Sequence, residues 1–540
     1  MSKRQQTFME GALVLMIAGL LVKVIGALFK LPLYNLVGPD AMAYFNIAYD
    51  IYVTMYIVTT AGLPVAVSRM VAESTARGQY ANARRILQVA FTSFLVLGAA
   101  GCAVLFFGAG PIARLMGMPG ADMAIRVIAP AILFEIVMSA YRGYYQGNQN
   151  MVPTAISQII VAIAKLGGGF LAAYYVLRLG LPVEQSYSAL AAAAISGVTL
   201  GTMLGSGYLV FRMLFFKPHA AEGLPESGKI DPFGLLLRQL VIITVPIAIG
   251  SMITSVSNLV DTAMINRRLL ASGLDSEAAR RLFGIYTGIS RTMFNLPPAL
   301  IGSIGIAVLP AISETFSCGR RAETAGLIAS PLRLTILLAL PAGMGFLAMA
   351  EPVLLLLYHS RAEDVAVAAP LLATLGIAVV FVCLVSITTS MLQAIGRERI
   401  PMATMLIGGV IKVLATYVLV GNPRIGLSGA PISTILCYLA ITLLNCAALT
   451  REIKPFPNLP EMFARPLFCS VTACVLGRLI YGLLLGPLSG RSATLVAVAV
   501  TVLLYLLLVL VTKTLYKSDI LSLPYGAFLV KPLEKRRWMR

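Results

Sequence analysis

Charged residues are scarce in this chain of 540 residues. Asp, Glu, Lys and Arg together make up 12% of it, and hydrophobic residues make up 58%. Soluble domains usually contain about 25% charged residues. The composition therefore excludes an ordinary soluble fold and indicates a polytopic membrane protein.

Histidines and paired cysteines are also lacking. Two histidines, His219 and His359, fall in predicted loops, and the seven cysteines show neither CxxC nor framework spacing. A Ser/His/Asp triad, a zinc site or a disulfide scaffold has almost no residues to be built from. We therefore expect no catalytic residues, no metal and no cofactor, and a protein that is not an enzyme.

The formal net charge of +19 does not indicate nucleic acid as a partner. Nucleic-acid binding needs a basic soluble face, whereas these Lys and Arg residues sit in short loops beside apolar segments. There they act as topology signals, and their distribution predicts that both termini are cytoplasmic. The main exception is the outer loop after the seventh predicted span, which contains Arg267, Arg268, Arg280 and Arg281. We expect that loop to form a helix at the membrane surface.

Apolar windows of about 20 residues predict an all-α protein with fourteen transmembrane helices. The predicted spans are 10–37, 43–67, 84–108, 121–146, 153–177, 187–214, 236–260, 283–309, 326–349, 364–392, 402–420, 427–449, 464–486 and 492–513. They group into an N-lobe over 1–216, a cytoplasmic linker over 217–235, a C-lobe over 236–450, two further helices over 451–513, and a basic cytoplasmic tail over 514–540.

The sequence also repeats itself. "YYQGNQNMVPTAISQIIVAIAK" at 144–165 resembles "MLQAIGRERIPMATMLIGGVIK" at 391–412, so that Pro153 matches Pro401 and Lys165 matches Lys412. "GLPVAVS" at 62–68 resembles "VLPAIS" at 308–313 at nearly the same offset. These matches indicate duplication of a six-helix unit. Because six is even, the two lobes are expected to share one orientation and to enclose a central cavity.

Several basic residues fall deep within predicted spans. Lys23 and Lys30 lie two helical turns apart on one face of "GLLVKVIGALFKLPLYNLVG", and Arg291 lies in "GISRTMFNLPP". Intramembrane charges usually face a cavity, and Arg and Lys together suit phosphate groups. We interpret them as an anion site. The alternative is that the lysines snorkel or pair internally, with Asp50 as the obvious partner of Lys30.

The remaining deep charges have several interpretations. Asp50 is either one member of a static ion pair or a site for a coupling cation or proton. Glu135 and Lys165 are expected to form a buried pair. Lys412 is the counterpart of Lys165, but the position that matches Glu135 is Val382, so Lys412 either pairs elsewhere or faces the cavity.

Three segments resemble the multidrug/oligosaccharidyl-lipid/polysaccharide exporter superfamily, and within it the MurJ/SpoVB/YtgP group of polysaccharide biosynthesis proteins. They are the opening "FMEGALVLMIAGLLVKVIGALFKLPLYNLVG", the "GLPVAVSRMVAE" that closes the second span, and "YRGYYQGNQNMVPTAISQI" between the fourth and fifth. The arrangement of six plus six plus two helices resembles that group as well.

The resemblance implies a V-shaped pair of lobes that alternates access. It implies export of lipid II or a related undecaprenyl-pyrophosphate sugar across the bacterial plasma membrane, for growth or for a spore wall. The group's basic residues in helices one and eight match Lys23, Lys30 and Arg291, whereas helix two carries Asp50 in place of a base. Implied partners are the polyprenyl-pyrophosphate glycolipid, membrane lipids and cell-wall synthesis proteins. Coupling to membrane potential, H+ or Na+ stays open.

Two other functions fit parts of the sequence. One is an ion-coupled multidrug or cation antiporter of the same superfamily, which the deep basic residues disfavour because its cargo is usually cationic. The other is a membrane-embedded polysaccharide polymerase, which ordinarily needs a long outer loop with catalytic acids. The longest predicted outer loop here is rich in arginine instead.

Overall fold

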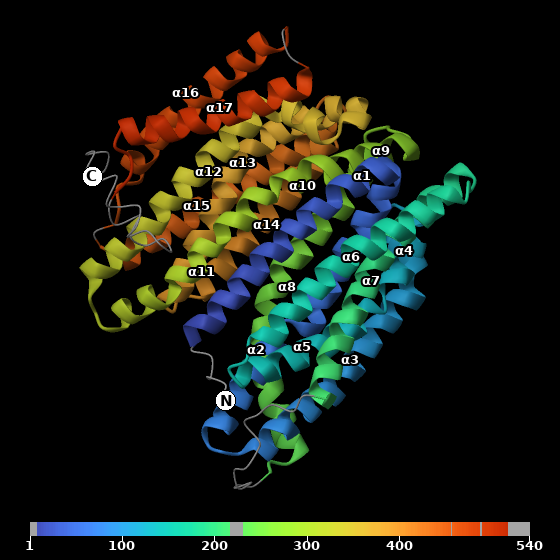
Figure 1. Cartoon of the computed structure of the whole chain (residues 1–540), viewed down its shortest axis with the longest axis vertical. Helices are drawn as coiled ribbons and strands as arrows, with labels where there is room; N and C mark the ends of the chain where they lie inside the picture. The colour runs from blue at the N-terminus through green and yellow to red at the C-terminus, as the bar shows by residue number, and fades with distance from the viewer. Residues whose placement is uncertain (1–7, 216–229, 455, 487–488, 517–540) are drawn as a thin grey trace. The chain divides into compact units, whose positions relative to one another are not determined.

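The computed structural model describes residues 8–215, 230–454, 456–486 and 489–516, and every regular element in these ranges is helical (Figure 1). Most of the predicted linker and most of the basic tail lie outside the described residues. By their contacts, the residues form two compact units. Unit 1 comprises residues 1–270 and 274–284, and unit 2 comprises 271–273 and 285–540.

Unit 1 contains nine α-helices among its described residues. They are α1 (Phe8–Thr60), α2 (Leu63–Ala76), α3 (Tyr80–Leu115), α4 (Asp122–Ile128), α5 (Ala131–Gly147), α6 (Val152–Arg178), α7 (Val183–Phe215), α8 (Phe233–Ala271) and α9 (Ser276–Ile285). The short turn η1 (Pro119–Ala121) precedes α4. The predicted C-lobe began at 236, but the contacts group α8 with unit 1, so the repeat and the packing divide the chain at different places.

The element α1 consists of two arms joined at Gly38. Gly38 has φ 80° and ψ 177°, a backbone conformation open to glycine and strained for other residues. A straight helix would separate positions 30 and 46 by about 24 Å. Instead Lys30 hydrogen-bonds Asn46, so the second arm folds back along the first. The two arms correspond to the predicted spans 10–37 and 43–67.

Helices α6 and α7 pack closely through glycines. A Cβ atom on Gly197 of α7 would lie 2.4 Å from the backbone nitrogen of Gly169 on α6. A Cβ atom on Gly201 would lie 2.7 Å from the carbonyl oxygen of Val161. Such contacts let two membrane helices approach backbone to backbone, and they hold the helix that carries Lys165 in place.

Unit 2 contains eight α-helices among its described residues. They are α10 (Arg291–Phe294), α11 (Leu296–Ser317), α12 (Arg321–Leu357), α13 (Ala362–Ala394), α14 (Arg399–Val420), α15 (Gly429–Glu452) and α16 with α17 (Leu459–Leu484 and Gly490–Val511), alongside the π-helix η3 (Tyr286–Ser290) and the short turns η4 (His359–Arg361) and η5 (Gly426–Ser428). Helices α16 and α17 pack on each other and on α12 (Figure 1). The Tyr505 hydroxyl of α17 donates to the carbonyl of Leu337 on α12.

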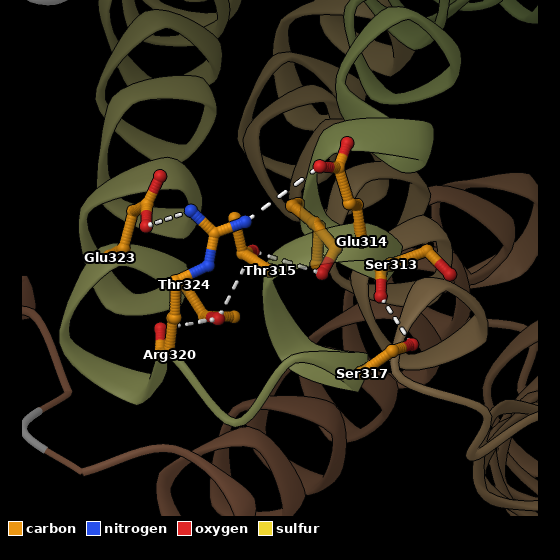
Figure 2. Close-up of polar contacts among 8 residues, drawn as sticks. Ser313, Glu314, Thr315, Ser317, Arg320, Glu323 and Thr324 are labelled. Atoms are coloured by element: carbon orange, nitrogen blue, oxygen red, sulfur yellow. Dashed lines mark hydrogen bonds and ion pairs between the residues drawn. The ribbon is translucent and has the colours of Figure 1, made fainter.

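A polar corner joins α11 to α12. Figure 2 shows Arg320 between the carboxylates of Glu323 and Glu314. Arg320 Nη1 lies 2.9 Å from Glu323 Oε2, and its Nη2 lies 3.7 Å from Glu314 Oε1. The Thr324 hydroxyl donates to the hydroxyl of Thr315 at 3.1 Å. Because these ion pairs are exposed, they contribute little stability, and the buried threonine contact fixes the corner.

The repeated segment folds in the same way in both units. After α5 and after α13, three successive N–H groups donate to the carbonyls four, three and five residues earlier. These bonds are Asn148 to Tyr144, Gln149 to Gln146 and Asn150 to Tyr145, and likewise Ile395 to Met391, Gly396 to Gln393 and Arg397 to Leu392. Gln149 and Gly396 both have positive φ. The second repeat differs, because Gly62 breaks the helix whereas 308–313 lies inside α11.

Eleven helices of the described residues are long and apolar enough to cross a membrane. The chain is thus a multi-pass membrane protein. The count of fourteen stays a prediction, because the first two predicted spans merge in α1. The predicted spans 236–260 and 283–309 fall on α8 and on η3 to α11, where several side chains lie outside the described part.

The contact between α6 and α7 predicts the effect of one added methyl group. We expect Gly197→Ala to lower the stability by about 1–3 kcal/mol because its Cβ would overlap Gly169. The matched control is Gly167→Ala on α6, where a Cβ atom meets nothing within 4 Å. Thermal unfolding of both variants in detergent measures the difference. Equal melting temperatures would contradict the close packing.

Candidate functional site

Lys30 lies inside unit 1 between polar and aromatic groups. Its Nζ donates to Asn46 Oδ1 at 3.1 Å and lies 5.7 Å from the centroid of the Tyr49 ring. Asn46 is buried, and both partners stand on the second arm of α1. The Gly38 turn therefore positions this ammonium group. The side chain of Lys23, the other basic residue predicted on this face, lies outside the described part of the chain.

Lys165 reaches the same aromatic ring from α6. Its Nζ donates to the Tyr49 hydroxyl at 3.3 Å and lies 4.3 Å from the centroid of that ring and 5.7 Å from that of Phe29. Tyr49 thus contacts two ammonium groups, that of Lys30 from the first arm of α1 and that of Lys165 from α6.

The expected ion pair between Glu135 and Lys165 does not form. Glu135 Oε1 instead accepts from the Tyr52 hydroxyl at 3.4 Å, and its buried Oε2 has no hydrogen-bond partner among the described residues. Tyr49 and Tyr52 stand between the two charges, with their ring centroids 6.1 Å apart. The two charges act on each other without direct contact. Depth along two neighbouring helices did not show which side chains a third helix places between them.

An aromatic ladder on the second arm of α1 was not predicted. Phe45, Tyr49, Tyr52 and Tyr56 follow one another with centroid spacings of 6.1 to 6.2 Å. Their spacing of four, three and four residues is that of one helical face. This periodicity could have revealed a face that presents three phenolic hydroxyls inside unit 1.

Arg142 on α5 is a second residue that the sequence analysis missed. Its guanidinium donates to Ser157 Oγ at 3.0 Å, and it acts electrostatically on Glu135 together with Lys165. Glu135 is therefore surrounded by Tyr52 of α1, Arg142 of α5 and Lys165 of α6. The Glu135 carboxylate thus has two cationic side chains nearby, but it forms no direct ion pair with either of them among the described residues.

Asp50 connects α1 to α8. Thr262 of α8 donates to Asp50 Oδ2 at 2.9 Å, and the Thr54 hydroxyl lies 3.5 Å from the carbonyl oxygen of Ser255. These contacts explain why α8 groups with unit 1. The static ion pair with Lys30 and the coupling role of Asp50 both stay predictions.

In unit 2, Arg291 follows an irregular segment. The π-helix η3 ends at Ser290, whose buried hydroxyl donates to the Ala368 carbonyl at 3.0 Å. The Thr292 hydroxyl donates to the carbonyl of Thr287 at 3.2 Å, five residues earlier. Single π-helical turns are common at functional sites. Arg291 and Lys412 of α14 are both half-buried.

Helix α9 is the predicted helix after the seventh span, but Arg280 is not a surface residue. Its Nε contacts Asp40 Oδ1 at 2.7 Å, and the two side chains are 17% and 13% exposed. The guanidinium also lies 5.7 Å from the Tyr44 ring and 5.3 Å from the Tyr187 ring. The pair ties α9 to the start of the second arm of α1.

The Asp40–Arg280 pair predicts strong coupling in a double-mutant cycle. We expect Arg280→Ala or Asp40→Ala alone to destabilise the protein by about 3 kcal/mol, because each leaves a nearly buried charge unpaired. The double variant should lose much less than the sum. Thermal unfolding of the four proteins measures the coupling, and strictly additive losses would show that the pair contributes nothing specific.

The described helices define an all-helical, multi-pass membrane protein. The inward-facing conformation of a multidrug resistance MATE family transporter of the MOP superfamily aligns with a TM-score of 0.63 and 14% identity, over 81% of this chain and 98% of that one. Residues 8–316 match the model of the polysaccharide biosynthesis protein family, and the chain belongs to that family.

Individual relatives agree with this family. Stage V sporulation protein B of Bacillus subtilis is 24% identical over 96% of this chain and 98% of its own. The lipid II flippase MurJ of the same organism is 23% identical over 82% of both chains. The structure of lipid II flippase MurJ in an inward closed conformation aligns with a TM-score of 0.69 and 16% identity, over 93% of this chain and 98% of that one. The resemblance found in the sequence is confirmed.

Proposed function

We propose that this protein moves a polyprenyl-pyrophosphate-linked precursor of a cell-wall glycan, lipid II or a related lipid-linked oligosaccharide, from the inner to the outer leaflet by alternating access. The proposal rests on one observation, the pair of ammonium groups of Lys30 and Lys165 on the Tyr49 ring inside unit 1. It involves binding and release of the cargo without covalent chemistry.

The position of Lys165 makes its charge costly. It lies midway along α6, which places it about 20 Å from either helix end. Placing a charge near the bilayer centre costs at least about 2.5 kcal/mol of free energy, whereas a cation–π contact stabilises that charge by about 0.5–2 kcal/mol. Its direct contacts among the described residues are neutral aromatic groups, and the nearby Glu135 carboxylate forms no direct ion pair with it. A bound anion would compensate the difference.

A pyrophosphate group suits these cations. Phosphate oxygens accept charge-assisted hydrogen bonds from several donors at once, and lysine ammonium groups and tyrosine hydroxyls supply them. In unit 2, we assign Arg291 and Lys412 to the same cargo. Lys23 is assigned with them from its place in the sequence. The similarity to the lipid II flippase MurJ and to Stage V sporulation protein B supports a cell-wall or spore-wall precursor.

One observation favours the antiporter as second candidate. The unpartnered oxygen of Glu135 is an anionic group of the kind that a cationic drug or a proton could use. Lys165 and Arg142 nearby would repel a cationic cargo, however, so the proton is the better occupant. We therefore propose that Glu135 takes up and releases the coupled proton. Asp50 instead joins α1 to α8.

Complementation tests the cargo. In bacteria whose own lipid II flippase is switched off, we expect the wild-type protein to restore access of an external probe to lipid II. Lys30→Ala and Lys165→Ala should each lower that access about tenfold or more, because each removes a charged contact to phosphate. Arg178→Ala is the matched control, since this exposed arginine lies on the same helix and contacts Tyr174.

Two outcomes would contradict parts of the proposal. Absence of rescue by a well-expressed wild-type protein would exclude lipid II as the cargo and leave a related lipid-linked oligosaccharide or the antiporter. Full activity of both lysine variants would exclude the anion site.

Glu135 and Asp50 predict different responses to pH. We expect Glu135→Gln to remove the pH dependence of transport, because it cannot take up a proton. Asp50→Asn should keep that dependence even if the overall rate falls. Transport into vesicles at a series of pH values, with and without sodium, measures both variants. An unchanged pH profile in Glu135→Gln would contradict the assignment.

A further inference from the structure

A cavity of about 400 Å³ lies within unit 2, apart from the residues discussed above. Helices α12 and α16, the segment before α16 and the segment after α17 line it. Its polar lining residues are Arg333, Asn458, Glu461, Arg465 and Tyr516. Leu337, Met462 and Pro466 contribute apolar surface. A volume of this size is ordinary for a small-molecule site.

One wall of the cavity depends on a sharp turn after α17. Lys513 has φ 50°, a left-handed conformation that is uncommon outside glycine. This turn directs Thr514, Leu515 and Tyr516 to the cavity. The guanidinium of Arg333 lies 4.3 Å from the centroid of the Tyr516 ring, and the Cys469 sulfur lies 3.4 Å from the Thr512 hydroxyl. The chain thus closes the cavity with a segment in a strained conformation.

The charge of Arg465 points to an anionic ligand. This half-buried guanidinium has five N–H donors, and it makes a long contact of 3.4 Å to the carbonyl oxygen of Thr512. Glu461 lies one helical turn earlier, but no ion pair joins it to Arg465 in the described residues. Arg333 adds a second guanidinium from another helix. Two arginines that line one cavity provide the planar donors that phosphate prefers.

In the predicted topology, the cavity also lies at the membrane depth of lipid head groups. It is formed by the first turns of α16, the N-terminal half of α12 and the end of α17. In the predicted topology these are the cytoplasmic ends of three spans. Basic pockets between helices on that side bind head groups of anionic lipids. We propose that this cavity binds the phosphate head group of an anionic phospholipid of the inner leaflet.

In this site Arg333 and Arg465 contact the phosphate oxygens. Asn458 and Tyr516 are placed to hydrogen-bond a hydroxylated head group, and Leu337 and Met462 contact the first carbons of the acyl chains. The apolar lining favours a lipid over free phosphate, which has no apolar part to bury. The site is independent of the cargo proposed above, because all its residues lie in α12, α16 and the segments before α16 and after α17.

Lipid titration of the purified protein tests the site. The melting temperature is measured in detergent with added phosphatidylglycerol, phosphatidylcholine or inorganic phosphate. We expect stabilisation by phosphatidylglycerol alone. Each arginine should contribute about fivefold to the apparent affinity for phosphatidylglycerol, so the double variant Arg333→Gln/Arg465→Gln should weaken that affinity roughly 30-fold. Arg478→Gln on the other half of α16 is the matched control, because Arg478 is 45% exposed and lies 3.8 Å from Glu351.

A second variant separates the loss of binding from a loss of folding. Ala329→Phe would fill the cavity and leave both arginines in place, and it should also abolish the response to phosphatidylglycerol. Equal stabilisation by phosphatidylcholine, or an unchanged response in both variants, would overturn the proposal. Stabilisation by inorganic phosphate to the same extent would show a site for free phosphate and overturn the lipid assignment.

Discussion

A positive charge in the middle of a bilayer needs a compensating group, and unit 1 places aromatic rings at Lys165 where a carboxylate would be the simpler choice. The contact of Lys165 with Tyr49 and Phe29 recovers only part of the cost of its burial. A direct pair with Glu135 would neutralise both residues permanently. Holding them apart on Tyr49 and Tyr52 leaves each able to interact with a cargo or a proton.

The surrounding scaffold serves this arrangement. Gly38 folds α1 back on itself, so that Lys30 and Tyr49 approach from its two arms. The glycine contacts of α6 with α7 fix the helix that presents Lys165. Thr262 binds Asp50 from α8, and Arg280 binds Asp40 from α9, so both elements after the linker pack on unit 1. The site therefore depends on backbone turns and close packing at several positions far apart in the sequence.

Sequence patterns predicted the all-helical fold and the longer repeat, because apolar length and matching turn segments are local properties. The turn before Pro153 and the turn before Pro401 form the same hydrogen bonds, as their similarity indicated. The same patterns could not predict that α8 packs in unit 1, because this depends on contacts such as Thr262 to Asp50. They also missed the tyrosines between Glu135 and Lys165, although the spacing of these tyrosines was visible. The left-handed turn at Lys513 has no glycine to mark it.

The most direct test of the central claim is a binding measurement on the purified protein. Native mass spectrometry would compare undecaprenyl pyrophosphate, undecaprenyl phosphate and the lipophilic cation tetraphenylphosphonium, for the wild-type protein and for Lys165→Gln. We expect the wild-type protein to prefer the pyrophosphate and Lys165→Gln to lose this preference. Preferential binding of the cation, or an unchanged preference in Lys165→Gln, would exclude an anion site at Lys165.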